Sequence, residues 1–337
     1  MAKPRDWDSR IGRRVRLRDL HVLFAVVQHG SMAKAGGYLG MSQSAVSQSI
    51  AALEHAVQVP LLDRTPRGVE LTPYGAALAR RGQAAFDELR SGVKDIEFLS
   101  DPDTGEVRIA CTESIAAGIL PSVIERFSSR HPKVRLQIVP TAGHEAGFTA
   151  LHERTVDVVL TLPPRPFEQD LGEQLHAEVL FLDRICFAAA VRSPLARRRK
   201  IDLADLATVP LISPAADTPG GAAVAEAFRR AGQPLPVSIT TFSVHLRSIL
   251  GMSGRFIAVL PASILRFNAG LSSLKELPLE LPMPQPPALI VTLRNRTLSA
   301  PVERFVQCAR EVAKAVPAPP PGRKRAPPGS TKGAPRR

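Results

Sequence analysis

Small polar side chains crowd the start of a predicted helix at residues 40–54, GMSQSAVSQSIAALE. Val46, Ile50 and Leu53 follow one another at spacings of four and three residues, which predicts a helix with one apolar, inward face. The other face carries hydroxyl and amide groups, on Gln43, Ser44, Ser47 and Gln48. Glutamine amides can pair with adenine edges, and short serine side chains let a helix approach a partner closely. The same pattern also fits a face that merely contacts water.

Short helices and a hairpin are predicted around this polar face. Apolar residues recur at helical spacing over residues 17–27, and Gly30 ends that helix. Ser31 is expected to cap the second helix and Ser42 the third. The stretch RTPRGVEL at residues 64–71 predicts a hairpin that turns at Pro and Gly. Two short helices joined by a tight glycine turn and followed by a hairpin are typical of a winged helix-turn-helix.

A long helix is predicted next, because Thr72 and Pro73 form a favourable helix start and no proline follows before about Leu99. Its apolar side recurs at close to coiled-coil spacing, at Leu78, Gly82, Ala85, Leu89, Val93 and Ile96. We expect this seam to pair with the same helix of a second chain. Packing against the chain's own domains is the alternative.

The rest of the chain alternates between apolar strands and helices, after a hinge-like linker at residues 101–105. The strand-like runs are EVRIAC, VRLQIVP, VDVVLTL, EVLFLDRICFAAAV, VPLIS and FIAVLP. Pro121 is expected to break the helical stretch after the first of them. This alternation predicts an α/β body with mainly parallel sheets, long enough for two similar lobes.

The 337-residue chain has the composition of a soluble globular protein, with 44% hydrophobic and 22% charged residues. No apolar run is long enough to predict a membrane span, and the charged first residues do not resemble a secretory signal. Cys111, Cys186 and Cys308 are widely spaced, which favours a reducing, cytoplasmic location over a disulfide framework. No Cys and His residues have zinc-ligand spacing, so we expect no metal and no cofactor.

The positive charge lies at the two ends. The net charge is +13; residues 1–16 contain six Lys or Arg and two Asp, and residues 317–337 contain six Lys or Arg and no acid. Basic ends favour a polyanion such as nucleic acid, although they also fit solubilising tails.

Residues 17–75 resemble the DNA-binding segment of LysR-type transcriptional regulators. The match is in register and without gaps at Gly30-Ser31, Ala33, Leu39, Ser42-Gln43, Val46-Ser47, Ile50, Leu53-Glu54, Leu61, Arg64, Leu71-Thr72 and Gly75. IACTESIAAGILP and FIAVLP resemble the openings of the family's two regulatory lobes, so the resemblance covers about residues 17–316. The chain departs from the family at Gly36, Gln58 and Leu62, where Ala, Gly and Phe are usual.

The resemblance implies sequence-specific binding to a double-stranded DNA operator, with the helix from Gln43 in the major groove. Its expected DNA-binding residues are Ser31, Ser42, Gln43, Ser44, Ser47, Gln48, Arg64 and Arg67. The glutamines would pair with adenine, and Ser44 and Ser47 would reach bases or phosphates. Ser31 and Ser42, as N-caps, would leave backbone N–H groups near the phosphates, and the arginines would flank the wing at phosphates or the minor groove.

The resemblance also implies a two-lobed, type 2 periplasmic-binding-protein-like domain that binds a small-molecule effector between its lobes. Side chains at the carboxyl ends of parallel strands should line that cleft. The expected effector-binding residues are Thr112, Ser114, Thr141, Thr161 and Ser213, of which Ser114 matches the family's ligand-contacting position. A helix N-terminus after Thr112 would favour a carboxylate, whereas Glu113 would repel one.

Other functions remain open at this point. Cys111 before a helix N-terminus could be a reactive thiol, either in an enzyme with His131, His144 or His152 as base or in a redox-sensing regulator. A transported-solute receptor would need the missing secretion signal. A DNA-compacting protein would use the basic ends without sequence preference. We expect no catalytic residues.

The predicted architecture is therefore an α/β protein with an N-terminal all-α winged helix-turn-helix. Its segments are a basic arm at 1–16, the winged helix-turn-helix at 17–74, a linker and dimerisation helix with a hinge at 75–104, the effector-binding domain at 105–316 and a disordered basic, Pro-rich tail at 317–337. The expected partners are operator DNA, a small-molecule effector and further copies of the chain, as a dimer or a dimer of dimers.

Overall fold

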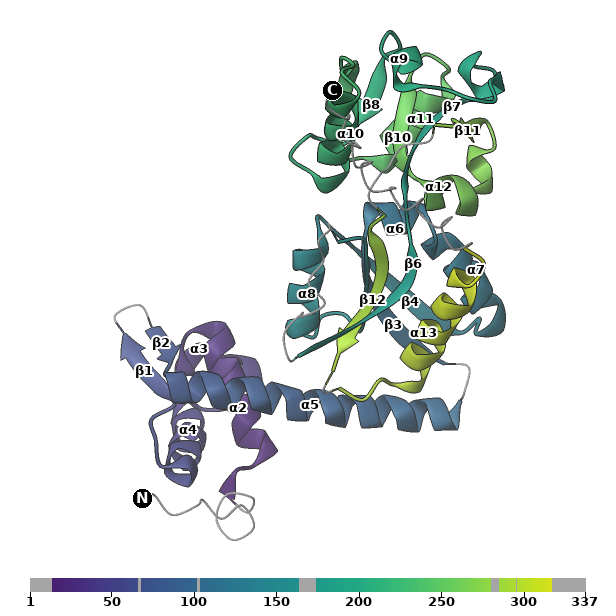
Figure 1. Ribbon diagram of the computed structural model, residues 1–337. Coiled ribbons are helices and arrows are strands. Elements are labelled where there is room, and N and C mark those ends of the chain that lie inside the picture. Colours follow the sequence, from purple (N-terminus) through teal and green to yellow (C-terminus); the bar gives the residue numbers. More distant parts are fainter. Residues whose placement is uncertain are drawn as a thin grey trace, which may run out of the picture. The chain divides into compact units, whose positions relative to one another are not determined.

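The computed structural model describes residues 14–65, 68–101, 104–163, 174–279, 285–294 and 296–316. The chain divides into two compact units, residues 1–99 and 100–337 (Figure 1). Most of the predicted basic arm, and all of the predicted tail at 317–337, lie outside the described residues.

The first unit is the predicted winged helix-turn-helix. Its elements are α2 (Leu17–His29), α3 (Met32–Leu39), α4 (Gln43–Val57), β1 (Leu62–Thr65), β2 (Gly68–Leu71) and α5 (Pro73–Ser100). Leu23, Val46 and Leu53 are fully buried in one core shared by the helices and the wing. The periodicity of the apolar residues therefore identified both the helices and their inward faces.

Helix ends in this unit follow the predicted capping residues with one exception. The Ser42 hydroxyl accepts a hydrogen bond from Ala45 N at 3.2 Å, and the Thr72 hydroxyl accepts one from Gly75 N at 2.9 Å. Ser31 occupies the N-cap of α3 with an extended backbone, but its side chain makes no capping bond. The position of that cap was predicted correctly and its hydrogen bond was not.

Gly36 is explained by the tight turn between α3 and α4. Met41 N donates to Gly36 O at 2.8 Å, and a Cβ added to Gly36 would lie 2.6 Å from the Met41 carbonyl oxygen. Atoms cannot approach that closely without a shift of backbone, so glycine lets these two helices close together here.

Helix α5 has two kinds of surface along its length. Leu78 packs against the core of the first unit, and Gly82 lies beside Leu20 and Phe24. Farther along, Leu89, Val93, Ile96 and Leu99 are 51%, 55%, 64% and 78% exposed. The predicted seam is thus covered by the chain's own residues at its start and open at its end.

The second unit contains two five-stranded sheets, each the centre of one lobe. The first has the order β4-β3-β5-β12-β6, and the second the order β11-β7-β10-β8-β9. In each sheet three consecutive strands pair in parallel, and one strand, β12 or β7, runs antiparallel to both of its neighbours. The prediction of mainly parallel sheets is corrected to mixed sheets with the same strand arrangement in both lobes.

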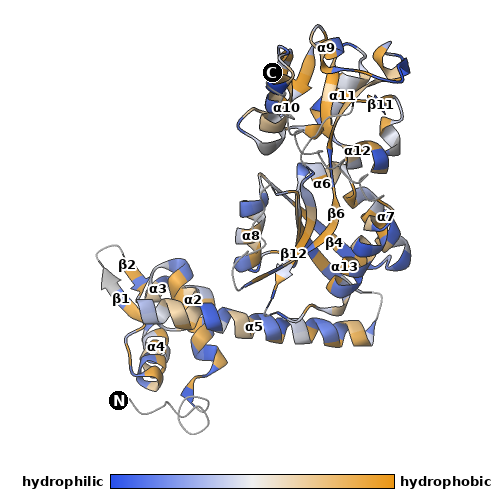
Figure 2. Cartoon of the chain, in the orientation of Figure 1, coloured by the Kyte–Doolittle hydropathy of each residue, from blue (hydrophilic) through white to orange (hydrophobic). Residues whose placement is uncertain are grey.

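The first lobe is closed by a segment from the end of the chain. Its strands are β3 (Gly105–Thr112), β4 (Val134–Thr141), β5 (Val158–Thr161), β6 (Leu175–Leu182) and β12 (Pro287–Leu293), and its helices are α6 (Glu113–Ala117), α7 (Leu120–Arg130), α8 (His144–His152) and α13 (Ala300–Ala313). Helices α7 and α13 cover one face of the sheet and α8 the other (Figure 1). Figure 2 shows the apolar character of β12, a strand that the sequence analysis did not assign.

The second lobe is inserted between β6 and β12. Its strands are β7 (Ile185–Ala190), β8 (Leu211–Ser213), β9 (Val237–Thr240), β10 (Ile257–Pro261) and β11 (Leu274–Glu276). Its helices are α9 (Leu203–Leu206), α10 (Pro219–Arg230), α11 (Val244–Met252) and α12 (Ala262–Phe267), with 3-10 turns at Leu195–Arg197 and Ala269–Leu271. Helices α9 and α10 pack on one face of the sheet, and α11 and α12 on the other.

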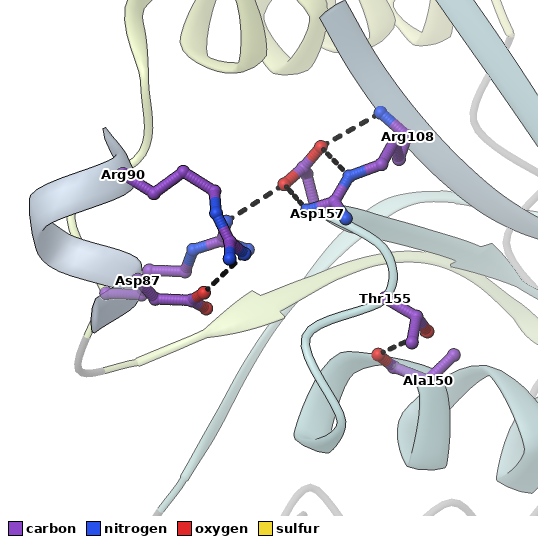
Figure 3. Close-up of polar contacts among 7 residues, drawn as sticks. Asp87, Arg90, Arg108, Ala150, Thr155 and Asp157 are labelled. Atoms are coloured by element: carbon purple, nitrogen blue, oxygen red, sulfur yellow. Dashed lines mark hydrogen bonds and ion pairs between the residues drawn. The ribbon is translucent and has the colours of Figure 1, made fainter. Parts of the chain in front are cut away.

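A buried ion pair fixes two strands of the first lobe to each other. The Asp157 carboxylate, just before β5, accepts hydrogen bonds from the backbone N, Nε and Nη2 of Arg108 in β3, at 2.9, 3.2 and 2.9 Å (Figure 3). Arg296 Nη2 donates to the same carboxylate at 3.0 Å. Burial raises the pKa of Asp157, but the hydrogen bonds from Arg108 outweigh it and the net pKa lies below its usual value.

Candidate nucleic-acid interface and ligand cavity

The polar residues of α4 form a continuous exposed stripe. Gln43, Ser44 and Gln48 are exposed and Ser47 is partly buried, whereas Val46 and Ile50 face the core. The stripe continues through Ala51 and Ala52 to His55, which are also exposed. His55 was not among the predicted DNA-binding residues, although its spacing of seven residues from Gln48 places it on the same side of the helix.

The start of α4 is held by hydroxyl groups that also lie at its surface. Ser42 Oγ and Ser44 Oγ are 2.9 Å apart, and Ser42 Oγ also caps the helix through Ala45 N. The Ser42 hydroxyl is therefore committed to the fold, whereas the Gln43 and Gln48 amides carry no intramolecular hydrogen bond among the described residues. These two amides are therefore free to bind a partner.

The wing is attached to the end of the same helix. The Glu54 carboxylate accepts hydrogen bonds from Leu61 N at 2.7 Å and Leu62 N at 3.3 Å, which fixes the first wing strand to α4. Gln58 ends α4 in the left-handed conformation, at φ 57°. Arg64 pairs with Val69 in the hairpin, but its side chain and the whole of Arg67 lie outside the described residues.

A cavity of about 600 Å³ lies between the two lobes of the second unit. Thr112 and Ser114 contribute from the first lobe, and Pro214, Thr218 and Arg247 from the second. It adjoins the carboxyl ends of β3 and β10, where open α/β sheets usually bind ligands. Its size suits a small organic molecule.

The five predicted effector-binding residues do not all reach this cavity. Thr112 and Ser114 line it, whereas Thr141, Thr161 and Ser213 are not part of its wall. Thr112 and Thr141 are direct neighbours in the parallel ladder, and the pairing of Cys111 with Leu160 puts Thr161 beside Thr112. The hydroxyls of all three threonines are buried without a hydrogen-bond partner in the described structure. A ligand role for these residues stays a prediction.

Glu113 bridges the two lobes instead of facing the ligand space. Its Oε1 accepts hydrogen bonds from Ser243 Oγ at 3.1 Å and from His245 N at 3.3 Å, at the start of α11 in the second lobe. A helix N-terminus stabilises a carboxylate. The repulsion of an anionic ligand that the sequence suggested is weakened by this arrangement.

Arg247 of α11 is a charged group of the cavity wall that the sequence analysis overlooked. It is 5% exposed, and its guanidinium donates to the carbonyl oxygens of Val259 and Phe242. Burial lowers its pKa to about 10, so it remains charged near neutral pH. The signal was present in the sequence, because Arg247 lies one helical turn from the buried Val244 and Gly251.

The three cysteines are buried thiols. Burial raises the pKa of Cys111 to about 11 and raises those of Cys186 and Cys308 as well. Burial therefore disfavours the alternative in which the following helix activates Cys111 as a reactive thiol. Within the described residues there is no group of His, Cys, Asp and Glu that could hold a metal ion, and no helix long and apolar enough to cross a membrane.

Two family models match the chain. The bacterial regulatory helix-turn-helix protein model of the lysR family matches residues 17–76, and the LysR substrate binding domain model matches residues 100–314. The transcriptional regulator YfeR of Shigella flexneri is 33% identical over 49% of this chain and 54% of its own length. The SDS degradation transcriptional activation protein of a Pseudomonas species is 31% identical over 85% of this chain and 93% of its own length. Full-length OxyR from Pseudomonas aeruginosa has a similar fold, with a TM-score of 0.56 at 18% identity over 89% of this chain and 95% of its own.

Proposed function

The chain belongs to the LysR family of bacterial DNA-binding transcriptional regulators, and from this premise we propose how its two units divide the work. The first unit binds an operator through α4 and the wing. The second unit binds a small-molecule effector in the cavity between its lobes. The relatives are regulators, and we assign this chain no catalytic residue. A regulator of chromosomal genes acts in the cytoplasm.

The exposed stripe of α4 is the observation that carries the DNA-binding assignment. Gln43 and Gln48 have free amides that can donate to N7 and accept from N6 of adenine in the major groove. Ser44 and Ser47 allow the helix to approach closely and reach bases or phosphates. Arg64, Arg67 and the backbone N–H groups of the helix starts at Ser31 and Ser42 contact the phosphate backbone. Such contacts fix the position of a protein on DNA without selecting its sequence.

The open half of the α5 seam supports self-association. Leu89, Val93, Ile96 and Leu99 remain exposed, and burying one such side chain contributes about 1.5–3 kcal/mol. Pairing with the same helix of a second chain would cover this surface and bring two copies of α4 to two half-sites. Contacts between effector units would then assemble dimers of dimers.

We expect effector binding to change the arrangement of the two lobes. The cavity is walled by both lobes, and the hydrogen bonds of Glu113 with Ser243 and His245 connect them across it. An effector that binds one lobe arrangement better than another shifts the population towards it. Because the seam and the lobes belong to one chain, that shift would alter how the assembly holds two half-sites.

Two substitutions distinguish base recognition by α4 from phosphate contact by the wing. Gln43→Ala should lose discrimination at one or two base pairs, because a bidentate amide contact is worth about 1–3 kcal/mol against the wrong base. Arg64→Ala should weaken binding to all sequences alike and reduce the salt dependence. Binding to a randomised set of operator variants measures both. Equal losses on all variants for Gln43→Ala would show that α4 does not select the bases.

A further inference from the structure

The cavity contains a cation that no carboxylate neutralises. Arg247 lines the wall and is 5% exposed, yet its hydrogen bonds go only to the carbonyl oxygens of Val259 and Phe242. Its Nε has no acceptor, and among the described residues no carboxylate lies within ion-pair distance of the guanidinium. Burial of a charge without a counter-ion is unfavourable, so an anionic partner at this position would stabilise the arrangement.

The other charged groups of the wall already have partners. Arg184 forms an ion pair with Glu276. Glu226 forms ion pairs with Arg229 at 2.7 Å and Arg230 at 2.5 Å.

Two further carboxylates near the cavity are also occupied. Asp183, which also lines the wall, accepts hydrogen bonds from Ser263 Oγ at 2.6 Å, from Ser263 N at 3.1 Å and from Arg184 N at 2.9 Å. Glu113, whose field reaches Arg247, accepts hydrogen bonds from Ser243 and His245. These carboxylates already have donors from the protein, whereas Arg247 keeps an Nε–H without an acceptor among the described residues.

The remaining wall is largely apolar. Leu162 and Ile185 face the space together with Phe242 and Val259. We propose that the effector is a small organic anion, an apolar body that carries one oxoacid group paired with Arg247. A guanidinium fork matches the oxygens of a carboxylate or a sulfate ester and still has Nε–H to donate. This inference rests on the proposed role of the cavity as the effector site.

Thermal unfolding of the full chain with matched anionic and neutral probes tests the proposal. The probes are sodium hexanoate, sodium benzoate and sodium hexyl sulfate, compared with hexanamide and benzamide at the same ionic strength. An anion at a concentration well above its Kd should raise the Tm of the wild type by about 3 °C, whereas hexanamide and benzamide should leave the Tm unchanged. Hexanoate and hexyl sulfate distinguish a carboxylate from a sulfate ester.

Variants locate the effect. Arg247→Met should abolish the rise in Tm, whereas Arg255→Met, which removes an exposed arginine of the same lobe outside the cavity, should preserve it. Equal rises in the Arg247→Met protein, or no rise with any anion in the wild type, would overturn the proposal.

A second readout does not depend on the stability of the Arg247 variant. In the 15N–1H spectrum of wild-type protein labelled with 15N-arginine, the signal of the buried Arg247 Nε–H should shift when the anion that raises the Tm is added. An unchanged set of arginine signals overturns the proposal.

The neutral probes give a separate outcome. If hexanamide and benzamide raise the Tm as much as the anions do, the cavity is a ligand site but the assignment of an anion is wrong. Sequence-specific DNA binding is measured in a separate experiment. A failure there would contradict the proposed function, whereas the Tm and NMR results decide the assignment of an anionic effector.

Discussion

The Glu54 carboxylate accepts a hydrogen bond from Leu61 N at 2.7 Å, and this contact joins α4, the helix that we propose to face DNA, to the wing. Leu61 is fully buried, so its N–H loses its hydrogen-bond partner if the Glu54 side chain is removed. An unsatisfied buried donor costs about 1–3 kcal/mol. Glu54 therefore adds a polar connection between α4 and the hairpin to the apolar core that they share.

Glu54→Ala should destabilise the first unit by about 1–3 kcal/mol and weaken binding to all DNA sequences, because the wing loses its fixed position. Urea unfolding and binding to an operator and to unrelated DNA measure the two effects. Glu70→Ala, in the exposed part of the hairpin, is the matched control. A Glu54 variant as stable as this control would contradict the role of the Leu61 contact.

Gln58→Gly should stabilise the first unit by about 1 kcal/mol, because Gln58 holds a left-handed backbone that costs a residue with a Cβ about 1–2 kcal/mol. Gln58→Ala retains the Cβ and should give no comparable gain. Chemical unfolding of the three proteins provides the comparison. If the Gly and Ala variants were equally stable, the backbone strain at this position would be negligible.

Val93→Asp should raise the dissociation constant of the dimer by about a hundredfold or more, because it places a charge in the proposed α5 seam. Sedimentation equilibrium gives the mass of the assembly at each concentration. The comparison is Arg81→Asp, also on an exposed position of α5 but outside the seam. A Val93 variant with an unchanged dissociation constant would exclude this seam as the interface.

Alkylation and peroxide should leave the native protein largely unaffected. The pKa of Cys111 is raised to about 11, so its reactive thiolate form is scarce at pH 7 and increases only as the pH approaches that value. Iodoacetamide labelling should be slow in the native state and fast in urea, and operator binding should not change with hydrogen peroxide. Rapid native labelling together with a peroxide-dependent change in binding would favour a redox sensor instead.

Asp157→Asn should destabilise the second unit by about 3–5 kcal/mol near neutral pH, since Arg108 and Arg296 lose their shared carboxylate. The folded pKa of Asp157 is lowered, so its contribution is present above the unfolded pKa and is lost as the pH falls through the folded value. The difference between wild type and variant should shrink in acid. A constant difference from pH 7 to acid would mean that the charge of Asp157 contributes little.

Local patterns predicted the first unit well because its helices are short-range structures. The spacing of Val46, Ile50 and Leu53 fixed the inner face of α4, and Ser42 and Thr72 marked helix starts by their capping chemistry. The start of the α5 seam packs on the chain's own residues, and this contact between Gly82 and residues about sixty positions earlier cannot be seen in the periodicity of the helix. Pairing of the remaining seam with a second chain stays a prediction.

Long-range arrangement limited the prediction of the second unit. Strand β12 joins the first sheet more than one hundred residues after β6, and it changes a parallel arrangement into a mixed sheet. Thr112 and Ser114 were correctly predicted to lie at the cleft from their positions at the end of β3 and the start of α6. The helical spacing of Arg247 from Val244 and Gly251 indicated its inward side, but only packing shows that its guanidinium lines the cavity without a counter-ion. Packing was also needed to decide against a reactive Cys111, because its burial is not visible in the sequence.

The central claim is that this regulator selects particular DNA sequences through α4. Binding of the purified full chain to a library of genomic fragments at about 150 mM salt tests it most directly, since nonspecific phosphate contacts are weakened there. The predicted result is recovery of a few fragments that share an inverted repeat. A double variant with Gln43→Ala and Gln48→Ala should no longer select these fragments. Recovery of fragments without any shared sequence would contradict the account and assign the binding to the basic ends of the chain.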